Sequence, residues 1–551
     1  MIGFSFFGRS KILTNLREQS YDLLIIGGGI TGAGIALDAA SRGLKTALLE
    51  KNDFAFGTSS RSTKLIHGGL RYLKQLEFGL VKEVGSERAV VHNLAPHLVV
   101  PEKMLLPLSE KKGLGYWLTS IGLKIYDWLA GVKPEDQRRM LTRSQTLRSE
   151  PLLRKDDVKG GAIYAEYRTD DARLTIENIK AAVQHGAEVL NYARVTGFLY
   201  EENKVVGVTV VDVLSGVEFQ IRSKAVVNAA GPWVDELREI NNSKQGKRLH
   251  LTKGVHIVVP YERFPVRQAI YFDADDDGRM IFAIPRGRTT YIGTTDTNYT
   301  GDKDHVYTSR EDAEYLLHAV NTTFASVPLV LSDIESSWAG LRPLIHEEGK
   351  SASELSRKDE IFESPTGLIS IAGGKLTGYR KMAERVVNLI IKKNFADRDL
   401  KPCHTITLKL PGAAFSSAKE IKNYNQQVYQ RLTLSGFSFA TARYLVENYG
   451  KQADAILQRF DKRPSSEPAE LSLLKAELWF GVHYEKVCTL QDFFVRRTGL
   501  LYFNITLVKA WKEAIAEELQ SYFGWDSTKT QQELNALDTL IRQVTNFKNH
   551  V

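Results

Sequence analysis

A glycine-rich turn between two apolar segments near the start of the chain most constrains its fold. Residues 23–26 have the length and composition of a buried parallel strand, and they lead directly into a Gly-x-Gly-x-x-Gly sequence. The alanine-rich stretch that follows, 33–42, is typical of a helix. Residues 44–49 then favour a second strand, which ends at Glu50. Together these segments predict a βαβ unit of about 30 residues that binds a dinucleotide.

Each glycine of the turn has a physical role in such a unit. Gly27 lets the chain turn sharply off the strand, and Gly29 lets a pyrophosphate approach the backbone because it has no Cβ. Gly32 lets the helix pack close to the sheet. The start of the helix offers N–H groups and a partial positive charge to the phosphates. Glu50 can accept hydrogen bonds from ribose hydroxyls and would repel a 2′-phosphate, which argues against NADP.

The composition is that of an ordinary globular protein with more than one domain. The chain has 551 residues, of which 43% are apolar and 25% charged, so two or three domains are expected. Its two cysteines, Cys403 and Cys488, offer no disulfide framework and favour a reducing, cytosolic setting. The sequence contains no Cys/His cluster that suggests a metal and no run of 18 apolar residues that could span a membrane.

The net charge of +8 favours anionic partners, such as a phosphorylated substrate or an acidic membrane surface. We expect no nucleic-acid binding, because no run of five or six basic residues occurs.

Two segments are candidates for contact with a membrane surface. Residues 1–20 are either an interfacial foot or a disordered leader, and residues 115–130, with two Trp and two Tyr, form either a membrane-surface helix or a helix packed on the core.

A hydroxyl-rich loop follows Glu50. Residues 58–64 combine Thr and Ser side chains with Lys64, and a Gly-Gly turn with a His and an Arg comes next, within 65–73. An ordinary loop of Ser/Thr turns would have the same composition. Its place directly after the second strand of a nucleotide-binding unit favours a loop that meets phosphates and the polar edge of an isoalloxazine ring.

Two stretches, GGGITGAGIALDAASRGL and TSSRSTKLIHGGLRYL, resemble the FAD-dependent, quinone-linked glycerol-3-phosphate dehydrogenases of the amino-acid-oxidase-like flavoproteins. Five later motifs continue the resemblance in family order: NAAGPW at 228–233, KGVHIVVP at 253–260, IGTTD at 292–296, GLRPL at 340–344 and GGKLTGYR at 373–380. The resemblance covers residues 20–400, and the helical pattern of the remaining chain fits the C-terminal domain of that family.

The resemblance implies an α/β fold with a Rossmann-like FAD-binding domain, an antiparallel-sheet substrate domain and an all-helical C-terminal domain. The expected segments are a leader at 1–20, FAD-binding segments at 21–95, 165–250 and 335–398, cap segments at 96–164 and 251–334, and C-terminal helices at 402–551. The implied reaction is oxidation of sn-glycerol 3-phosphate to dihydroxyacetone phosphate, with hydride transfer to FAD and electrons passed to a quinone. The alternatives are an oxygen-using glycerol-3-phosphate oxidase and, less favoured, an amine or amino-acid oxidase-like enzyme. The implied location is cytoplasmic and peripheral at the inner face of the cell membrane, and a homodimer is possible.

The resemblance also implies site residues. Those expected to bind FAD are Gly27, Gly29, Gly32, Glu50, Ser59, Ser60, Thr63, Lys64, Leu65, Gly374, Leu376 and Thr377. Those expected to bind the substrate phosphate are Arg71, Arg342 and Lys375, each beside a Gly or Pro turn, with Tyr72 and Arg357 as weaker additions. The candidates for the base are His256 and His67, since imidazole has a pKa near 6.5, and a reaction that uses neither stays open. Arg342 is also a candidate for stabilising the developing alkoxide.

Overall fold

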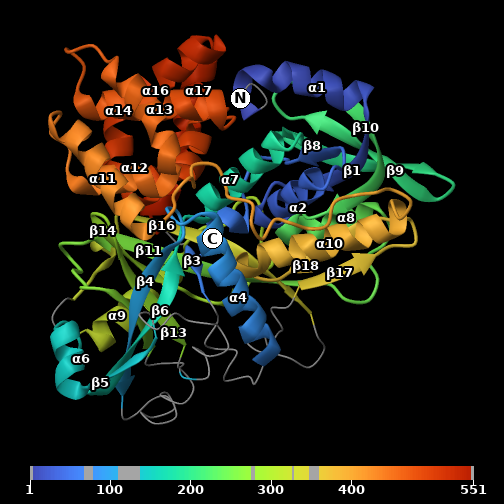
Figure 1. Ribbon diagram of the computed structural model, residues 1–551. Helices are drawn as coiled ribbons and strands as arrows, with labels where there is room; N and C mark the ends of the chain where they lie inside the picture. The colour runs from blue at the N-terminus through green and yellow to red at the C-terminus, as the bar shows by residue number, and fades with distance from the viewer. Residues whose placement is uncertain are drawn as a thin grey trace.

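The structure is a computed structural model that describes residues 4–67, 78–109, 124, 137–274, 279–324, 328–346 and 359–547. Two sheets and a block of C-terminal helices make up this part of the chain (Figure 1). Outside the sheets and that block lie helices α1 (Arg9–Glu18), α2 (Ile30–Ser41), α4 (Phe78–Leu94), α6 (Arg143–Ser149), α7 (Asp171–Gln184), α8 (Val234–Ile240), α9 (Arg310–Thr323) and α10 (Tyr379–Asn394).

The first sheet has the parallel centre of a nucleotide-binding fold. Its eight strands are β1 (Ser20–Ile26), β2 (Thr46–Leu49), β7 (Glu188–Leu190), β8 (Ala193–Glu201), β9 (Lys204–Asp212), β10 (Glu218–Asn228), β17 (Asp359–Glu363) and β18 (Ile369–Gly373). Strand β1 runs parallel to β2 on one side and to β10 on the other, and β18 runs parallel to β10. All residues of β1 after Ser20 are buried, as expected of a strand covered on both faces.

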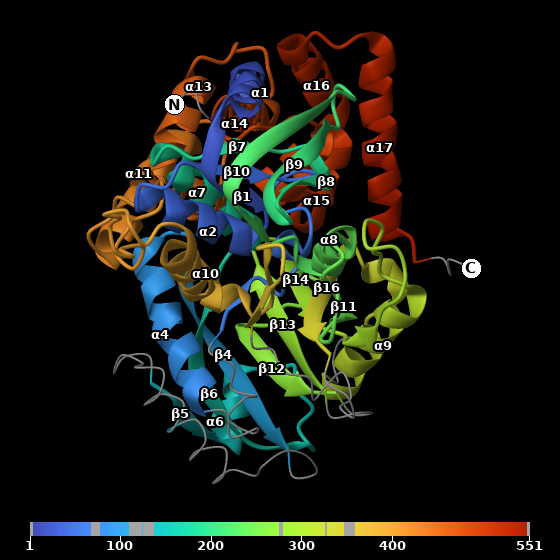
Figure 2. The ribbon, with the colours of Figure 1, turned by 90° about the vertical axis from the view of Figure 1, so that its right-hand side faces the viewer.

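Different elements cover the two faces of this sheet. Leu23 and Ile25 of β1 belong to a core shared with α2, α7 and α10, and Figure 2 shows α2 and α10 side by side. Leu24 and Ile26, which point the other way, pack with α1 and with the antiparallel strands β8 and β9. The predicted βαβ unit is therefore present, with helices on one face and a small antiparallel layer on the other.

The second sheet is largely antiparallel and has ten strands. They are β3 (Leu65–Ile66), β4 (Val100–Ser109), β5 (Arg139–Thr142), β6 (Val158–Arg168), β11 (Leu249–Pro260), β12 (Ala269–Asp273), β13 (Met280–Arg286), β14 (Thr289–Gly293), β15 (Thr297–Asn298) and β16 (Ser336–Ile345). Val255 and Ile257 of β11 pack in the core that includes α9. Val258 packs in the core formed with the C-terminal helices, so His256, two residues earlier, lies on that same face of the sheet.

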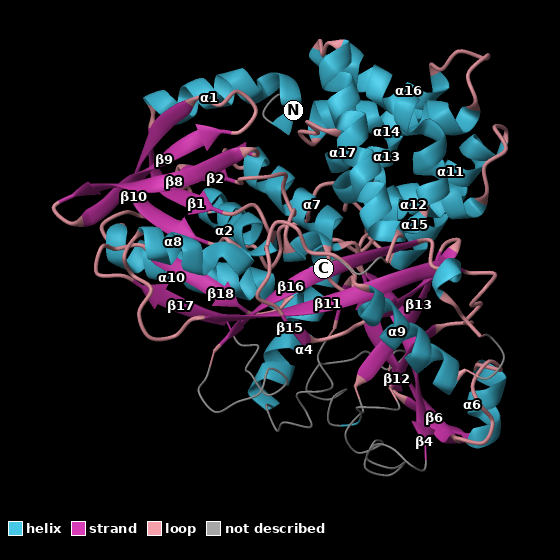
Figure 3. Ribbon diagram, turned by 180° about the vertical axis from the view of Figure 1, so that it is seen from behind, coloured by secondary structure: helices cyan, strands magenta, loops and turns pink. Residues whose placement is uncertain are grey.

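The C-terminal region is helical, as predicted. Its helices are α11 (Ala418–Thr433), α12 (Phe439–Tyr449), α13 (Ala453–Asp461), α14 (Ala469–Tyr484), α15 (Leu500–Phe503), α16 (Ile505–Phe523) and α17 (Ser527–Thr545), with a π-helix at Asp492–Arg497. Figure 3 shows them as one block beside both sheets. The α/β fold class with a helical C-terminal domain is therefore confirmed.

The N-terminal segment differs from the expected leader. From Phe4 onward it is folded, and α1 packs on the first sheet. Phe4 is fully buried against Phe54, with 5.7 Å between ring centroids, and Leu16 of α1 is fully buried as well. Arg9 donates to the Asp212 carboxylate at 2.5 Å. The described part of the leader is thus a packed helix and not a disordered one, because Ile12 and Leu16 form an apolar stripe one turn apart.

Some of the predicted domain boundaries differ from the structure, and one predicted helix lies outside the described residues. The predicted FAD-binding segment 335–398 is split, since β16 belongs to the second sheet and β17 and β18 to the first. The boundary expected between 164 and 165 falls inside β6. The candidate membrane-surface helix at 115–130 lies outside the described residues, apart from position 124. Within the part of the chain that the structure describes, no helix is long and apolar enough to cross a membrane.

Candidate functional site

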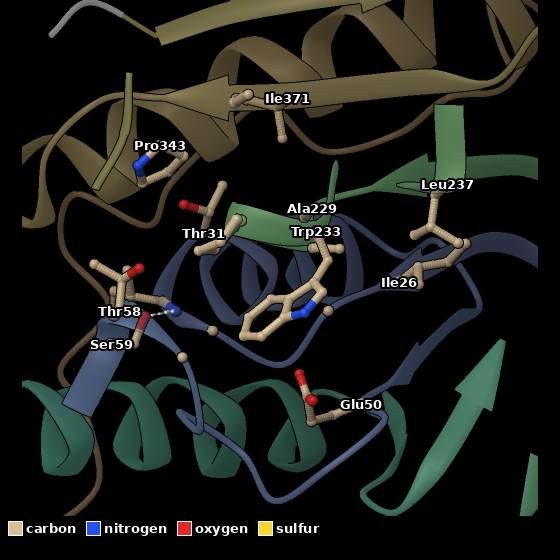
Figure 4. A pocket seen from close by; sticks show the side chains of 18 of the residues that line it. Ile26, Thr31, Glu50, Thr58, Ser59, Ala229, Trp233, Leu237, Pro343 and Ile371 are labelled. Atoms are coloured by element: carbon tan, nitrogen blue, oxygen red, sulfur yellow. Dashed lines mark hydrogen bonds between the residues drawn. The ribbon is translucent and has the colours of Figure 1, made fainter. Parts of the chain in front are cut away.

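A cavity of about 590 Å³ opens at the carboxyl ends of the central parallel strands (Figure 4). Its size is typical of small-molecule and cofactor sites, and its position is where open α/β sheets bind their ligands. The walls come from the β1–α2 turn, the segment 50–62, strand β8 at 193–196, the segment 229–240 and the turn 371–376.

The glycine turn has no room for side chains. Gly27 has a φ of +114°, and a Cβ there would lie 2.5 Å from the Ala229 carbonyl oxygen. A Cβ on Gly32 would lie 1.9 Å from the Gly27 carbonyl oxygen, so only glycine lets the helix pack this closely. Gly29 precedes α2 and brings no side chain to its N-terminus. The N-terminus of α2, which carries a partial positive charge, therefore borders the cavity with no side chain from Gly29 in the way. This arrangement suits a pyrophosphate.

Glu50 braces this turn and also faces the cavity. Its Oε2 accepts from the Gly28 N–H at 2.7 Å and its Oε1 from the Asn52 N–H at 2.9 Å. Burial raises the pKa of Glu50, although these hydrogen bonds oppose that effect. The carboxylate lies beside the indole of Trp233, which reaches into the cavity (Figure 4). Lys51 Nζ lies 4.3 Å from the centroid of the Trp233 ring.

The residues of the hydroxyl-rich loop point in different directions. Ser59 Oγ faces the cavity and accepts from the Ile30 N–H at 2.9 Å. Thr58 Oγ1 donates to the Leu341 carbonyl at 2.6 Å, which ties the loop to β16. Ser60 is buried, and its hydroxyl has no hydrogen-bond partner among the described residues.

Lys64 forms a buried ion pair with Asp171, a residue of the cavity wall. Its Nζ donates to Asp171 Oδ1 at 2.5 Å and to the Ser60 carbonyl at 3.2 Å, and Asp170 Oδ2 lies 3.6 Å away. Asp170 also caps α7 by accepting from the Arg173 N–H. Burial opposes the charged form of Lys64, but the two carboxylates outweigh it and raise the pKa of the ammonium. Lys64 is therefore a charged group that fixes the hydroxyl-rich loop to the start of α7.

His256 contacts the same loop from the second sheet. Its side chain is only 2% exposed, and Nε2 lies 3.0 Å from Thr63 Oγ1. The imidazole stacks on Trp338, with 4.7 Å between centroids and 12° between planes, and Trp338 Nε1 donates to the Ser62 carbonyl. Burial, reinforced by the charges of Arg342 and Lys64, holds the pKa of His256 well below its usual range. The ring is therefore neutral at physiological pH.

Arg342 lies on β16, next to β11. Its guanidinium donates to Thr294 Oγ1 at 2.8 Å, to the Thr295 carbonyl at 3.1 Å and to Asp296 Oδ1 at 3.1 Å. The preceding carbonyl accepts from the hydroxyl-rich loop, and the following residue, Pro343, lines the cavity. Arg342 is therefore a cation that lies where the second sheet meets the cavity wall.

The turn before α10 closes the cavity on its other side. Gly373 and Gly374 both have a φ of +78°, which favours glycine. Lys375 and Leu376 line the cavity and lead into α10. Thr377 Oγ1 donates to the His67 carbonyl at 3.1 Å, which joins this turn to the end of the segment 65–67.

The structure thus gathers part of the predicted site. The predicted residues that line the cavity are Gly27, Gly29, Glu50, Ser59, Gly374, Lys375 and Leu376. Three further predicted residues lie next to lining residues: Arg342 precedes Pro343, and His256 contacts Thr63, which follows Ser62. Lys64 does not line the cavity but pairs with Asp171, which does. Arg71, Tyr72 and Arg357 lie outside the described residues. The cavity is also lined by residues that were not predicted from the sequence, namely Lys51, Trp233, Asp304 and strand β8, although the GPW motif already contained Trp233.

Comparisons with known proteins agree with this site. The model of the family "FAD dependent oxidoreductase" matches residues 22–379, and that of "C-terminal domain of alpha-glycerophosphate oxidase" matches 403–530. The chain is 49% identical over 543 residues to the aerobic glycerol-3-phosphate dehydrogenase of Bacillus subtilis, covering 98% of each chain. It is 47% identical over 551 residues to the enzyme of that name from Staphylococcus aureus strain USA300, covering 99% of this chain and 98% of the other.

A solved structure is similar over the whole chain. The glycerol-3-phosphate dehydrogenase of Bacillus halodurans, crystallised with FAD, superposes with a TM-score of 0.84 at 46% identity and covers 100% of both chains. The bare helix start, the close glycine packing and the carboxylate of Glu50 fit the ADP half of FAD. On these grounds the chain belongs to the family of FAD-dependent, aerobic glycerol-3-phosphate dehydrogenases.

Proposed function

We propose that this enzyme oxidises sn-glycerol 3-phosphate to dihydroxyacetone phosphate and passes the electrons from FAD to a quinone. The observation that carries the proposal is the set of groups in and next to the cavity. Lys375 lines it, Arg342 directly precedes the lining residue Pro343, and neutral His256 contacts Thr63 of the hydroxyl-rich loop. The names of the full-length relatives supply the substrate, since each is called an aerobic glycerol-3-phosphate dehydrogenase.

The cations account for a phosphorylated substrate. Arg342 presents a planar fork that can hold a phosphate by two hydrogen bonds, and Lys375 adds a second positive charge on the cavity wall. Arg71, Tyr72 and Arg357 would complete this cradle. The hydrogen bonds of Arg342 to Thr294 and Asp296 fix the direction of its side chain before substrate binds. The side chain therefore loses little conformational entropy on binding.

His256 is the favoured acceptor for the proton of the C2 hydroxyl, and His67 is the alternative. Bound FAD supplies the acceptor for the hydride. His256 is deprotonated at physiological pH, as a base must be before it acts, and the burial and Arg342 charge that keep it so also weaken its affinity for the proton it would accept. Trp338 and Thr63 fix the orientation of its ring by stacking and by hydrogen bonding. Arg342 can in addition stabilise negative charge that develops on the substrate oxygen.

Oxygen is the second candidate for the electron acceptor. The family model that matches residues 403–530 is named after a glycerophosphate oxidase, which favours this alternative. The dehydrogenase names of the full-length relatives favour a quinone instead. A quinone is dissolved in the membrane, so we also propose a peripheral contact with an anionic membrane surface at the inner face of the cell membrane, in keeping with the net charge of +8.

Anaerobic titration of the flavin absorbance tests the reaction. The purified protein should be yellow, and glycerol 3-phosphate should bleach it in the absence of NAD. A soluble quinone analogue should then restore the colour faster than air does, with little peroxide formed. Stoichiometric peroxide in air would favour the oxidase, and bleaching by an amine or amino acid in place of glycerol 3-phosphate would contradict the substrate assignment. Co-sedimentation with vesicles containing anionic lipids, lost at high salt, tests the membrane contact.

A further inference from the structure

The segment 50–56 packs against the glycine turn and is hydrogen-bonded to it. Besides the bond from Gly28 N–H to Glu50, the Ala55 N–H donates to the Gly28 carbonyl at 3.0 Å. Phe54 is fully buried directly under the turn, where a Cβ on Gly28 would lie 2.7 Å from its ring. Ala55 has a φ of +62°, an unfavourable conformation for a residue with a side chain. This segment therefore needs outside contacts to stay in the shape that presents Glu50 to the cavity.

The turn between β7 and β8 supplies some of these contacts: the Asn191 side chain donates to Asp53 Oδ1 at 3.2 Å, and the Tyr192 N–H donates to the Asn52 carbonyl at 2.8 Å. The C-terminal domain supplies the others, from more than 400 residues away in sequence. The π-helix at Asp492–Arg497 directs two guanidinium groups at Asp53. Arg497 donates to both carboxylate oxygens, at 2.8 and 2.9 Å, and Arg496 Nε donates to Oδ2 at 2.5 Å. Arg496 also donates to Asp492 at 2.8 Å. Turns of π-helix are rare in proteins, and many of those that occur lie at functional sites.

This cluster is buried and balanced in charge. Asp53 and Asp492 are fully buried, and Arg496 and Arg497 are 4% and 1% exposed. Burial alone would raise the pKa of Asp53, but the two guanidinium groups outweigh it and lower the pKa, so the carboxylate stays charged. Because the pair is bidentate, it fixes both the position and the orientation of Asp53. None of these four side chains lines the cavity.

We propose that Arg496 and Arg497 are positioning residues through which the C-terminal domain sets the affinity for FAD. By fixing Asp53, they hold the segment 50–56 and thereby Glu50 and the glycine turn, so they act on the ADP half of the cofactor. This inference rests on FAD binding and is independent of the substrate and the electron acceptor. The C-terminal domain then has a role in cofactor retention at a cavity that none of its described residues lines.

Substitution of arginine by lysine tests the proposal, because it keeps the buried charge and removes the forked hydrogen bonding. At position 497 it also removes two bonds to the Glu485 carbonyl within the C-terminal domain, at 3.0 and 2.8 Å. In the full-length protein with Arg497→Lys, we expect the dissociation constant of FAD to rise about tenfold or more, measured from flavin fluorescence on dilution. The inhibition constant of ADP, as a competitor of FAD binding, should rise by a similar factor. Turnover at saturating FAD should stay within about twofold of the wild type, since no reacting group changes.

Arg168→Lys is the matched control. Arg168 also joins the C-terminal helices to a sheet, donating through both terminal nitrogens to Glu447 of α12 at 3.0 and 2.9 Å, but it does not contact the segment 50–56. Its substitution should leave the ADP constant unchanged. Should Arg497→Lys fail to fold, Arg496→Lys leaves both Arg497 bonds intact and should give a smaller change in the same direction. Unchanged FAD affinity, weaker FAD binding with unchanged ADP inhibition, or an equal change in Arg168→Lys would each overturn the proposal.

Discussion

The direction of Arg342 depends on a glycine on the neighbouring strand. A Cβ at Gly254 would lie 2.1 Å from Nη2 of Arg342, so any other residue there would displace the guanidinium. Three hydrogen bonds to the segment 294–296, two from Nη1 and one from Nη2, then fix the plane of the guanidinium. The cation is therefore oriented by its own sheet, independently of any ligand, and this orientation is what a phosphate-binding arginine requires.

Replacement of this arginine should chiefly weaken substrate binding. Arg342→Leu removes a charge-assisted interaction worth about 1.5–3 kcal/mol, so we expect the KM for glycerol 3-phosphate to rise roughly 10–100-fold, while the FAD content stays at the wild-type level. Steady-state kinetics with a quinone analogue measure both KM and kcat. Arg288→Leu, which breaks an exposed pair with Glu335 in the same sheet, should leave KM unchanged. A wild-type KM in Arg342→Leu would remove this residue from the phosphate site.

His97 should make the protein sensitive to acid. Burial, with the charges of Arg173 and Lys180, lowers the pKa of His97 to about 3, and its ring nitrogens have no hydrogen-bond partner in the described part of the chain. Above pH 6.5 the ring is neutral in both the folded and the unfolded state, so it contributes no pH dependence. Between pH 6.5 and about 3 only the unfolded state takes up the proton, so stability falls by about 1.4 kcal/mol per pH unit.

A leucine at position 97 should remove this acid sensitivity. The thermal midpoint of His97→Leu should fall less than that of the wild type between pH 7.5 and 5.5. His318→Leu, at an exposed position of α9, should keep the wild-type slope. Equal slopes in all three proteins would mean that His97 binds a proton in the folded state.

Helix α1 shows how a short element becomes part of the core. Its three buried residues, Arg9, Ile12 and Leu16, follow one face, and Arg9 donates to the Asn191 carbonyl as well as to Asp212. The helix lies on β7 and β10, and Leu16 packs among side chains of the first sheet. The N-terminal segment therefore covers part of the sheet whose strand ends border the cavity.

Truncation of the fully buried leucine of this helix tests its packing. Leu16→Ala should destabilise the protein by about 2–5 kcal/mol, the usual cost of a cavity at a fully buried leucine. The expected result is a lower urea midpoint for the loss of tryptophan fluorescence. Lys11→Ala, on the exposed face of the same helix, should leave the midpoint within experimental error. Equal midpoints for the two variants would show that α1 does not pack on the sheet in solution.

Elements whose signals are local in sequence could be predicted, and contacts between distant segments could not. The βαβ unit was predictable because strand, glycines, helix and Glu50 follow within one short stretch. The pairing of Lys64 with Asp171 spans 107 residues, and the contact of His256 with Thr63 spans 193. Lys64 was predicted to bind FAD from its place in the hydroxyl-rich loop, and its pairing with Asp171 could not be predicted, because only the fold shows which carboxylate lies next to a buried ammonium.

At the scale of the whole molecule, a loop of the second sheet reaches across to the FAD-binding sheet. Between β15 and α9, Asp304 pairs with Lys51 at 2.7 Å, and Lys303 pairs with Glu236. Three of these four residues line the cavity: Lys51, Glu236 and Asp304. The two ion pairs therefore join the second sheet to the first at the rim of the cavity. The side chains of both pairs are 26–48% exposed, which leaves them open to screening by salt.

FAD release should therefore depend on ionic strength. An exposed ion pair contributes up to about 1 kcal/mol, so between 0.05 and 1 M NaCl we expect the rate of FAD release to rise about 2–5-fold, measured by the recovery of flavin fluorescence. Asp304→Asn should release FAD faster at low salt and respond less to added salt, because one pair is already broken. Asp302→Asn, which loses a contact to His305 within the loop, should behave as the wild type does. If the release rate of the wild type does not change with salt, the cavity is closed by packing of the sheets and not by these pairs.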